Sequence, residues 1–209
     1  MTPGPGDALL VIDVQGDFLP GGALAVPEGD AVVAPIRALA ARFRTVVLTQ
    51  DWHPAGHASF ASAHPGRAPF ETVRLAYGDQ VLWPDHCVQG TAGADLARDL
   101  DLPGAALVLR KGLNPAVDSY SAFAEADGTP TGLAGYLRER GIGRVVLCGL
   151  ATDYCVAWSA LDARAAGFAA LVADDATRAI DQGGSLAQAW ARMSAAGIGR
   201  ITSTRITRS

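Results

Sequence analysis

Short apolar segments recur along the chain, most of them rich in β-branched residues and each closed by a polar residue or glycine. Such segments are typical of strands that are buried on both faces of a parallel sheet. The predicted strands cover residues 8–13, 45–49, 106–111, 144–149 and 169–174. The C-terminal segment RITSTRI adds a predicted strand at an edge of the sheet.

Alanine-rich segments with helical spacing separate several of these strands. The predicted helices cover residues 31–43, 132–140, 155–166 and 185–196. Strands that alternate with helices indicate a doubly wound α/β fold, with a mainly parallel sheet of about five or six strands and helices on both faces. The sequence contains neither an internal repeat nor a linker, so residues 1–209 are predicted to form a single domain.

The stretch from residue 50 to residue 105 interrupts this alternation. It holds several prolines and glycines and all four histidines of the chain, but little periodicity apart from a predicted helical segment within 93–100. Excursions of this length in a compact domain are usually functional. We therefore expect this stretch to contribute to a site.

Composition narrows the functional classes. A hydrophobic fraction of 49% with 18% charged residues is that of a globular protein. The net charge of −4 and the scattered basic residues disfavour a nucleic-acid partner. The N-terminus does not resemble a signal peptide, and the apolar runs fall far short of the ~20 residues that span a bilayer, so secretion and membrane insertion are not expected. Three cysteines cannot all pair with one another, which suits a reducing cytoplasm.

Four reactive side chains lie at or just after the ends of four predicted strands. Asp13 ends the first, Asp51 follows the second, Lys111 ends the third, and Cys155 lies just past the fourth. Ligands of open parallel sheets bind beyond the carboxyl ends of the strands. The sequence therefore predicts that these four groups meet at one edge of the sheet.

Cys155 is the predicted nucleophile. Thr152 or Asp153 is a plausible N-cap for the helix that follows, so the thiol would lie in its first turn. The helix dipole lowers the pKa of a thiol there, and the thiolate is the reactive form. Cys148, inside a predicted strand, and Cys87 are interpreted instead as small buried hydrophobic residues.

Asp13 and Lys111 fit a role beside this thiol. A carboxylate can take the thiol proton and return it to a leaving amine, although Asp13 could equally cap a turn. The Lys111 ammonium would favour the charged forms of Asp13 and Cys155, although most lysines are solvated surface groups.

Asp51 and His53 are two residues apart, so on an extended backbone their side chains lie on the same side and can reach one ion. His86 would complete a set of one carboxylate and two imidazoles. The expected ion is one divalent transition metal, Zn2+ before Fe2+ or Mn2+. His57 is a fourth ligand or a supporting residue, and the alternative is a polar loop that happens to hold histidines.

Five ordered motifs resemble the nicotinamidase/pyrazinamidase branch of the isochorismatase-like cysteine hydrolases: VIDVQGDF, TQDWHPAGHASF, WPDHCVQGT, RKGLNPAVDSYSAF and GLATDYCV. The resemblance covers residues 8–174. It implies that Asp13, Lys111 and Cys155 form a catalytic triad, and that Asp51, His53 and His86 are the metal ligands.

The resemblance also implies a substrate and a reaction. Nicotinamide, a small aromatic amide, would be hydrolysed to nicotinate and ammonia through a thioester, and pyrazinamide would react likewise. Phe18 and Trp83 would flank the ring, although both could simply pack in the core. A cis peptide bond is implied between Leu150 and Ala151, and the N–H groups of Ala151 and Cys155 would bind the oxyanion. The resemblance leaves a homo-oligomer open.

Three other functions stay open from the sequence. A metal-free amidase acting on a carbamoyl or ureido compound would have no need of the aspartate and histidine motif. A non-haem iron oxygenase would use Asp51, His53 and His86 as its facial triad but would leave Cys155 and Lys111 without a role. A binding module with the same fold would have no activity at all.

Overall fold

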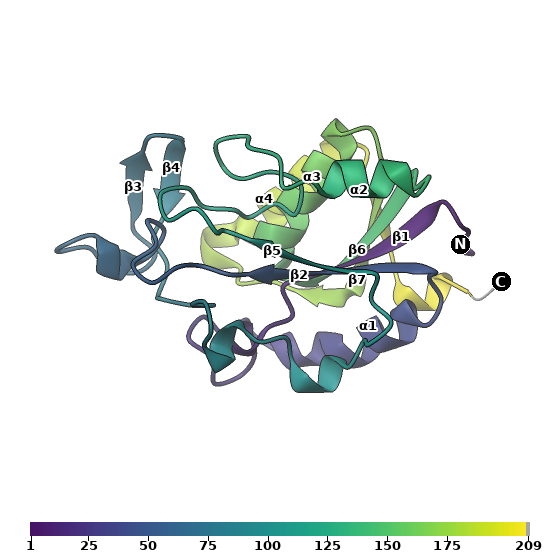
Figure 1. Ribbon diagram of the computed structural model, residues 1–209, viewed down its shortest axis with the longest axis horizontal. Coiled ribbons are helices and arrows are strands. Elements are labelled where there is room, and N and C mark those ends of the chain that lie inside the picture. Colours follow the sequence, from purple (N-terminus) through teal and green to yellow (C-terminus); the bar gives the residue numbers. More distant parts are fainter. Residues whose placement is uncertain (208–209) are drawn as a thin grey trace.

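A six-stranded parallel sheet runs through the centre of the protein, which is described by a computed structural model over residues 1–207 (Figure 1). The strands follow one another across the sheet in the order β5-β2-β1-β6-β7-β8. Their bounds are β1 Asp7–Ile12, β2 Thr45–Asp51, β5 Leu107–Lys111, β6 Arg144–Leu150, β7 Ala169–Arg178 and β8 Gly199–Ile201. The predicted fold class is therefore confirmed, and the C-terminal edge strand is present but short.

The central position of β1 in the sheet explains why residues 8–12 are all apolar. All six of its residues are buried, because it pairs with β2 on one side and β6 on the other. Leu9, for example, lies in register with Val46 and Val146. A strand that is covered on both faces buries every side chain, and each fully buried Leu, Ile or Val contributes roughly 1.5–3 kcal/mol.

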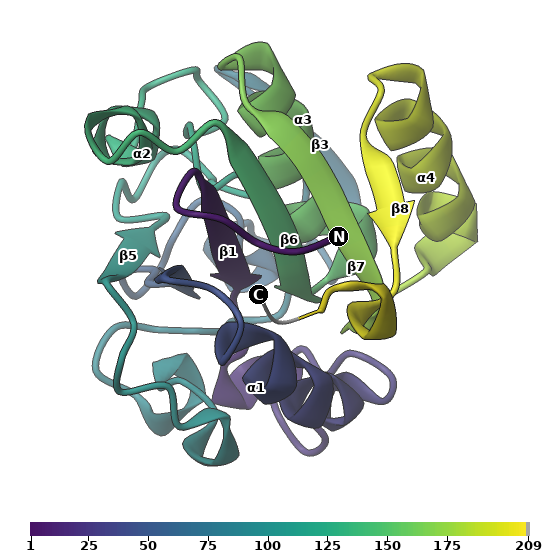
Figure 2. The ribbon, with the colours of Figure 1, turned by 90° about the vertical axis from the view of Figure 1, so that its right-hand side faces the viewer.

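Helices cover both faces of the sheet (Figure 2). Helix α1 (Val33–Ala40) lies on one face and buries Ile36 and Leu39. The other face is covered by α2 (Leu133–Glu139), α3 (Ala157–Ala165) and α4 (Ser185–Ala195). The four predicted helices are thus present.

The helix predicted within 93–100 is wrong. Two short 3-10 turns, Ala92–Ala94 and Arg98–Leu100, occupy this segment. The residues between them pair instead with the chain that leaves β1, through an antiparallel bridge between Gln15 and Leu96 and a hydrogen bond from the N–H of Ala97 to the carbonyl of Val14. The segment therefore forms backbone hydrogen bonds with the chain that leaves the carboxyl end of β1, which a helix could not form.

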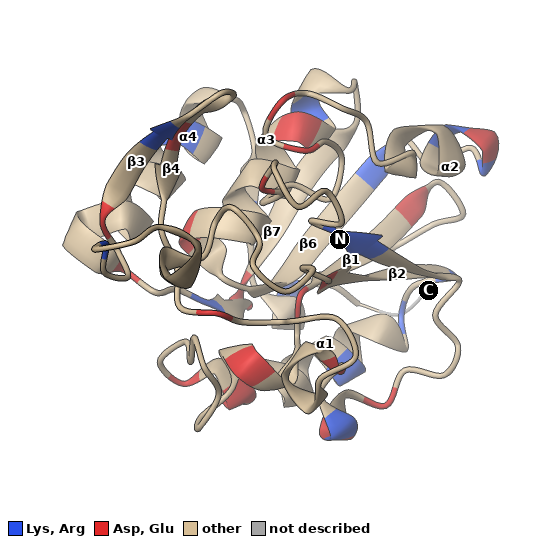
Figure 3. Cartoon of the chain, turned by 60° about the vertical axis from the view of Figure 1, so that its left-hand side comes forward, with Lys and Arg blue, Asp and Glu red and all other residues tan. Residues whose placement is uncertain are grey.

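An antiparallel hairpin, β3 (Thr72–Leu75) and β4 (Gly78–Val81), lies beyond the carboxyl ends of the sheet and was not predicted (Figure 1). Figure 3 shows Lys and Arg interspersed with Asp and Glu around the described chain, as scattered basic residues would suggest. Among residues 1–207 the longest α-helix, α4, has 11 residues, too short to cross a bilayer, which takes about 20.

Candidate active site

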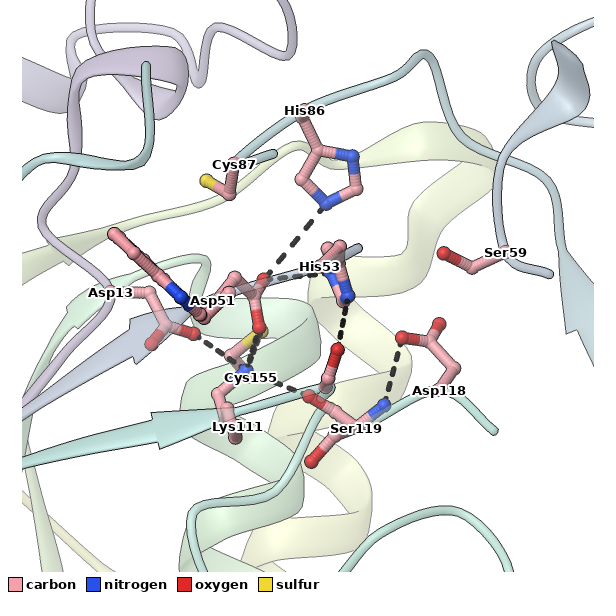
Figure 4. A network of polar contacts seen from close by, with 12 residues as sticks. Asp13, Asp51, His53, Ser59, His86, Cys87, Lys111, Asp118, Ser119 and Cys155 are labelled. Atoms are coloured by element: carbon pink, nitrogen blue, oxygen red, sulfur yellow. Dashed lines mark hydrogen bonds and ion pairs between the residues drawn. The ribbon is translucent and has the colours of Figure 1, made fainter. Parts of the chain in front are cut away.

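The four reactive groups meet at the carboxyl edge of the sheet, as predicted (Figure 4). Asp51 and Lys111 are the last residues of β2 and β5, and Asp13 follows β1 directly. Cys155 lies in the turn that follows β6. Because β5, β2, β1 and β6 are consecutive neighbours in the sheet, their ends are adjacent although they are distant in sequence.

Lys111 is the centre of this cluster and is fully buried, which excludes the solvated surface lysine. Its Nζ lies 2.9 Å from Oδ2 of Asp13 and donates hydrogen bonds to Asp51 and, at 2.7 Å, to the carbonyl of Ser119. Sγ of Cys155 is 3.6 Å away. The ammonium therefore contacts the predicted nucleophile and both carboxylates at once.

The charged groups in the cluster stabilise one another. Burial opposes the positive charge of Lys111, but Asp13, Asp51 and Cys155 outweigh it and raise the pKa of Lys111 well above its ordinary value. Burial raises the pKa of Asp13, against the opposing effect of Lys111 and of a 2.5 Å hydrogen bond donated by Thr49. Within residues 1–207 the only partner of Oδ2 of Asp13 is Nζ of Lys111, so a lone pair of this oxygen remains that can receive a proton.

The environment of Cys155 differs from the prediction. The N-cap of its turn is Ala151, not Thr152 or Asp153, and the turn Thr152–Val156 is π-helical. Burial raises the pKa of the thiol well above its ordinary value, and Asp13 and Asp51 raise it further against the effect of Lys111. The thiol is therefore protonated at rest and needs a base, which Asp13 can supply.

The other two cysteines have the buried surroundings predicted for them. Both side chains are inaccessible to solvent, and burial raises the pKa of each thiol. Sγ of Cys148 donates to the carbonyl of Leu10 at 3.6 Å, on the strand next to its own. Neither thiol lines the pocket described below.

The predicted metal ligands converge on one point. Oδ2 of Asp51 lies 3.8 Å from Nε2 of His53 and 3.9 Å from Nε2 of His86. Nδ1 of His53 is bonded to the carbonyl of Gly112 at 3.1 Å, and Nδ1 of His86 to that of Pro84 at 2.8 Å. A ring that donates from Nδ1 presents the lone pair of Nε2. Two such imidazoles and a carboxylate, all buried, are a donor set that fits a divalent transition metal.

His57 lies beside this set without a free nitrogen. Its Nδ1 is bonded to Oγ of Ser59 at 2.8 Å, and its Nε2 donates to the carbonyls of Asn114 and Val117 at 2.9 and 3.2 Å. Its ring centroid is 4.3 Å from that of His53. Of the two roles left open for His57, the contacts favour a supporting residue that packs against a ligand.

A pocket opens beside the cysteine and the metal ligands. About 350 Å3 of space lies between its lining atoms, a volume that includes space open to solvent. Its lining comprises Phe18, Leu24, Asp51, Trp83, His86, Asp118, Tyr120, Ala151, Tyr154, Cys155 and Ile180. Phe18 and Trp83 thus face the pocket as well as the core, and the peptide bond between Leu150 and Ala151 is cis, as the resemblance implied.

Comparison with known proteins decides the family, because the isochorismatase domain matches residues 7–205. The chain belongs to the isochorismatase family. It is 56% identical to a nicotinamidase from Acinetobacter baylyi, over 95% of this chain and 94% of that relative. A solved nicotinamidase/pyrazinamidase from Acinetobacter baumannii is 56% identical, with a TM-score of 0.96 over 97% of this chain and 98% of the other.

A second solved member of the family carries a metal. The pyrazinamidase from Pyrococcus horikoshii, solved in complex with zinc, is 38% identical, with a TM-score of 0.78 over 95% of this chain and 99% of the other. These matches confirm the resemblance to the nicotinamidase/pyrazinamidase branch of the isochorismatase family.

The structure adds a buried carboxylate to this isochorismatase site that the sequence did not single out. Asp118 lines the pocket and accepts hydrogen bonds from the N–H of Ser119 at 2.8 Å and from Gln80 at 2.7 Å. Burial opposes its charge, but His53, His57 and these hydrogen bonds lower its pKa. Asp118 therefore sets a negative charge beside His53, a predicted metal ligand.

Two tyrosines in the pocket were also missed. Oη of Tyr120 accepts a 2.9 Å hydrogen bond from Nε1 of Trp83, and the ring of Tyr154 meets Trp83 edge-on at 4.8 Å. Tyr154 could have been suspected because it precedes Cys155. Tyr120 follows no strand end and belongs to no periodic pattern, so only its place in the motif RKGLNPAVDSYSAF marked it.

Proposed function

We propose that this member of the isochorismatase family is a metal-containing cysteine amidohydrolase that converts nicotinamide to nicotinate and ammonia, and that it also accepts pyrazinamide. One observation carries the proposal: Lys111 contacts Cys155, Asp13 and Asp51 at once. Cys155 in turn lines one small aromatic pocket together with Asp51 and His86, two of the three predicted metal ligands. The relatives named nicotinamidase and the zinc complex of a pyrazinamidase support it.

The first half of the reaction transfers the acyl group to sulfur. Asp13 takes the proton of Cys155, and Sγ attacks the carboxamide carbon to form a C–S bond. The N–H groups of Ala151 and Cys155 hold the oxyanion. Asp13 then gives its proton to the departing nitrogen, the C–N bond breaks, and ammonia leaves a thioester behind.

The second half of the reaction releases nicotinate. Asp13, again unprotonated, takes a proton from a water molecule, whose oxygen attacks the thioester carbon. The C–S bond breaks, and the proton returns from Asp13 to Sγ of Cys155. The carboxylic acid formed loses its remaining proton to solvent and leaves as nicotinate. Lys111 stays charged throughout and keeps both Asp13 and the developing thiolate stable in a buried site.

Asp51, His53 and His86 would hold the metal, one divalent transition ion, with Zn2+ as the first choice. When bound, the ion would bind the pyridine nitrogen and so orient the ring. Phe18 and Trp83 would enclose the faces of the ring. Tyr120 and Tyr154 contact Trp83 and so hold it in place. We assign the enzyme to the cytoplasm and to the salvage of nicotinamide for NAD synthesis, in keeping with three buried cysteines that form no disulfide.

Ammonia release from nicotinamide by purified protein of known metal content tests the proposal. We expect turnover that rises with the fraction of protein that carries metal. Protein that is folded and loaded with metal, but releases no ammonia from nicotinamide or pyrazinamide, would refute it. Oxygen-dependent turnover would point instead to the iron oxygenase.

Benzamide should be a much poorer substrate than nicotinamide. It keeps the carboxamide but lacks the ring nitrogen, so it cannot use the metal as an anchor. We expect its kcat/KM to be at least about 100-fold lower, because a site built to bind a polar atom discriminates strongly against an analogue that lacks it.

The matched variants for this comparison are Asp51→Asn and His53→Ala, with metal content measured by mass spectrometry. Both should lose metal and lower kcat/KM for nicotinamide more than for benzamide. Equal kcat/KM values of the wild-type enzyme for the two amides would contradict a ring-anchoring metal.

Cys148→Ala should keep its activity and lose a little stability. The side chain is fully buried in β6 and lies outside the pocket, so its loss leaves a small cavity only. We expect a decrease of about 1 kcal/mol in the free energy of unfolding, measured in urea, and kcat/KM within about twofold of the wild type. A stable but inactive Cys148→Ala protein would show that the wrong cysteine has been assigned.

A further inference from the structure

The segment between β7 and α4, residues 178–185, forms one wall of the pocket. Ile180 lines the pocket beside Cys155. Beyond it the backbone takes positive φ angles at Asp181, Gly183 and Gly184, and a single 3-10 turn separates the segment from α4. Arg178 ends β7 in register with Leu150, and Ser185 begins α4. Between these two ends, residues 179–184 are held neither by strand pairing nor by an α-helix.

Asp153 supplies the hydrogen bonds that hold this segment. Its Oδ1 accepts from the N–H of Ile180 at 3.1 Å, and its Oδ2 accepts from the N–H of Asp181 at 2.8 Å and from Oγ of Ser185 at 2.5 Å. The carboxylate is 2% exposed and makes no cap for its own turn. Since Asp153 is two residues before Cys155, it ties the nucleophile's turn directly to the wall.

The pocket is nearly closed in this arrangement. Of the roughly 350 Å3 between its atoms, only about 20 Å3 is wide enough for the centre of a water molecule. About 10–15 Å3 of such space is needed for one water, so an aromatic amide does not fit until a wall moves.

Segment 178–185 is one of the less buried walls of the pocket. Phe18 and Trp83 are 6% and 3% exposed and belong to the core, and Asp51 and Cys155 are fixed by the buried cluster, whereas Ile180 is half-buried. Apart from Asp153, the segment is held by the packing of Ile180 against the core and by an ion pair at 3.3 Å between Arg178 and the exposed Glu28. Surface pairs of this kind contribute little.

We propose that Asp153 is a positioning residue that clamps segment 178–185 over the pocket, so that the clamp must open before the aromatic ring can bind. This inference rests on the proposed function, which supplies the ligand. If only the open fraction of molecules binds, weakening the clamp raises that fraction and with it the rate of association. A weaker clamp also lets segment 178–185 move further from the pocket, so that larger rings can bind.

The chain offers a matched control for the clamp. Asp175 accepts a hydrogen bond from the N–H of Ser203 at 2.7 Å and another from its Oγ at 2.6 Å, the same chemistry as Asp153 with Ser185. Neither Asp175 nor Ser203 lines the pocket. Asp175→Asn and Ser203→Ala therefore remove comparable hydrogen bonds elsewhere in the fold.

The test is stopped-flow binding of nicotinate, followed by tryptophan fluorescence, in the metal-loaded protein. Asp153→Asn and the milder Ser185→Ala should raise the association rate constant, Asp153→Asn by about tenfold, since hydrogen bonds to a charged group are the stronger kind. Asp175→Asn and Ser203→Ala should leave it at the wild-type value. A rate constant that is unchanged or lowered in Ser185→Ala, or raised equally in the controls, overturns the clamp.

Turnover gives the second readout. With nicotinamides that carry a methyl, ethyl or propyl group at ring carbon 5, kcat/KM should fall less steeply with substituent size in Ser185→Ala than in the wild type or in Ser203→Ala. Equal slopes overturn the clamp even if the wild type hydrolyses nicotinamide well. A wild type that neither binds nicotinate nor releases ammonia overturns the proposed function, and the clamp falls with it.

Discussion

Replacing Cys155 with alanine should abolish ammonia release from nicotinamide while the protein keeps its fold. The variant removes the only sulfur that lines the pocket and contacts Lys111. We expect kcat to fall by at least about 10⁴-fold, since no other group described in the pocket can form the thioester. The small side chain leaves Lys111 paired with Asp13 and Asp51, so the buried charges stay balanced.

Two measurements separate loss of the nucleophile from loss of the fold. Mass spectrometry of acid-quenched wild-type protein should reveal a nicotinoyl adduct on the peptide that contains Cys155, and the variant should form none. Urea unfolding should give both proteins similar midpoints. If Cys155→Ala hydrolyses nicotinamide at the wild-type rate, the covalent mechanism is wrong.

Lys111→Met should lose both activity and a large part of the stability. The lysine is fully buried between Asp13 and Asp51, so the variant leaves Asp13 without a cation and Asp51 with only the proposed metal. Breaking a buried charge pair by removing one partner costs about 3–5 kcal/mol, and methionine keeps the volume, so little of this loss would come from a cavity. We expect kcat/KM to fall strongly as well, because Asp13 and the thiolate lose the charge that stabilises both.

Arg144→Met is the control for Lys111→Met. Arg144 pairs with Asp7 through two short hydrogen bonds, but its side chain is 37% exposed. Loss of such a pair should cost about 1 kcal/mol or less and leave activity intact. Lys111→Arg should rescue activity poorly, because a wide planar guanidinium replaces a compact ammonium in a site with no room. If the Lys111→Met protein is as stable and as active as the wild type, Lys111 has no part in the mechanism.

The position of the site could be predicted because it depends on a rule about parallel sheets. Asp13, Asp51 and Lys111 lie at or directly after the ends of buried strands, and the carboxyl ends of neighbouring parallel strands share one edge. Burial on both faces requires an apolar run in each strand. The run predicts where the strand lies, and the polar residue after it predicts where the strand ends.

The state of the thiol could not be predicted in the same way. The position of Cys155 just after β6 suggested a helix start and a lowered pKa, but the side chain is also buried beside two carboxylates. Sequence shows the local turn and does not show how much solvent the fold excludes. The helix terminus lowers the pKa of the thiol and burial raises it. The packing around the turn decides which effect is larger, and here burial is.

Contacts made across long stretches of chain were missed for a related reason. Asp153 was interpreted as a cap for its own helix, yet its partners Ile180, Asp181 and Ser185 are 27 to 32 residues further on. Tyr120 reaches Trp83 from a segment without periodicity. No local propensity encodes such pairs, because they depend on how β7 and the loop after β5 return to the same end of the sheet.

The order of the strands also governs how the site forms during folding. Thr49 meets Asp13 across 36 residues of chain, Lys111 meets Cys155 across 44, and Lys111 meets Asp51 across 60. Each of these contacts closes a long loop, and together they require β5, β2, β1 and β6 to have docked in register. A partly folded chain therefore contains the reactive residues but not the assembled active site. Catalytic activity should appear only when the sheet is complete.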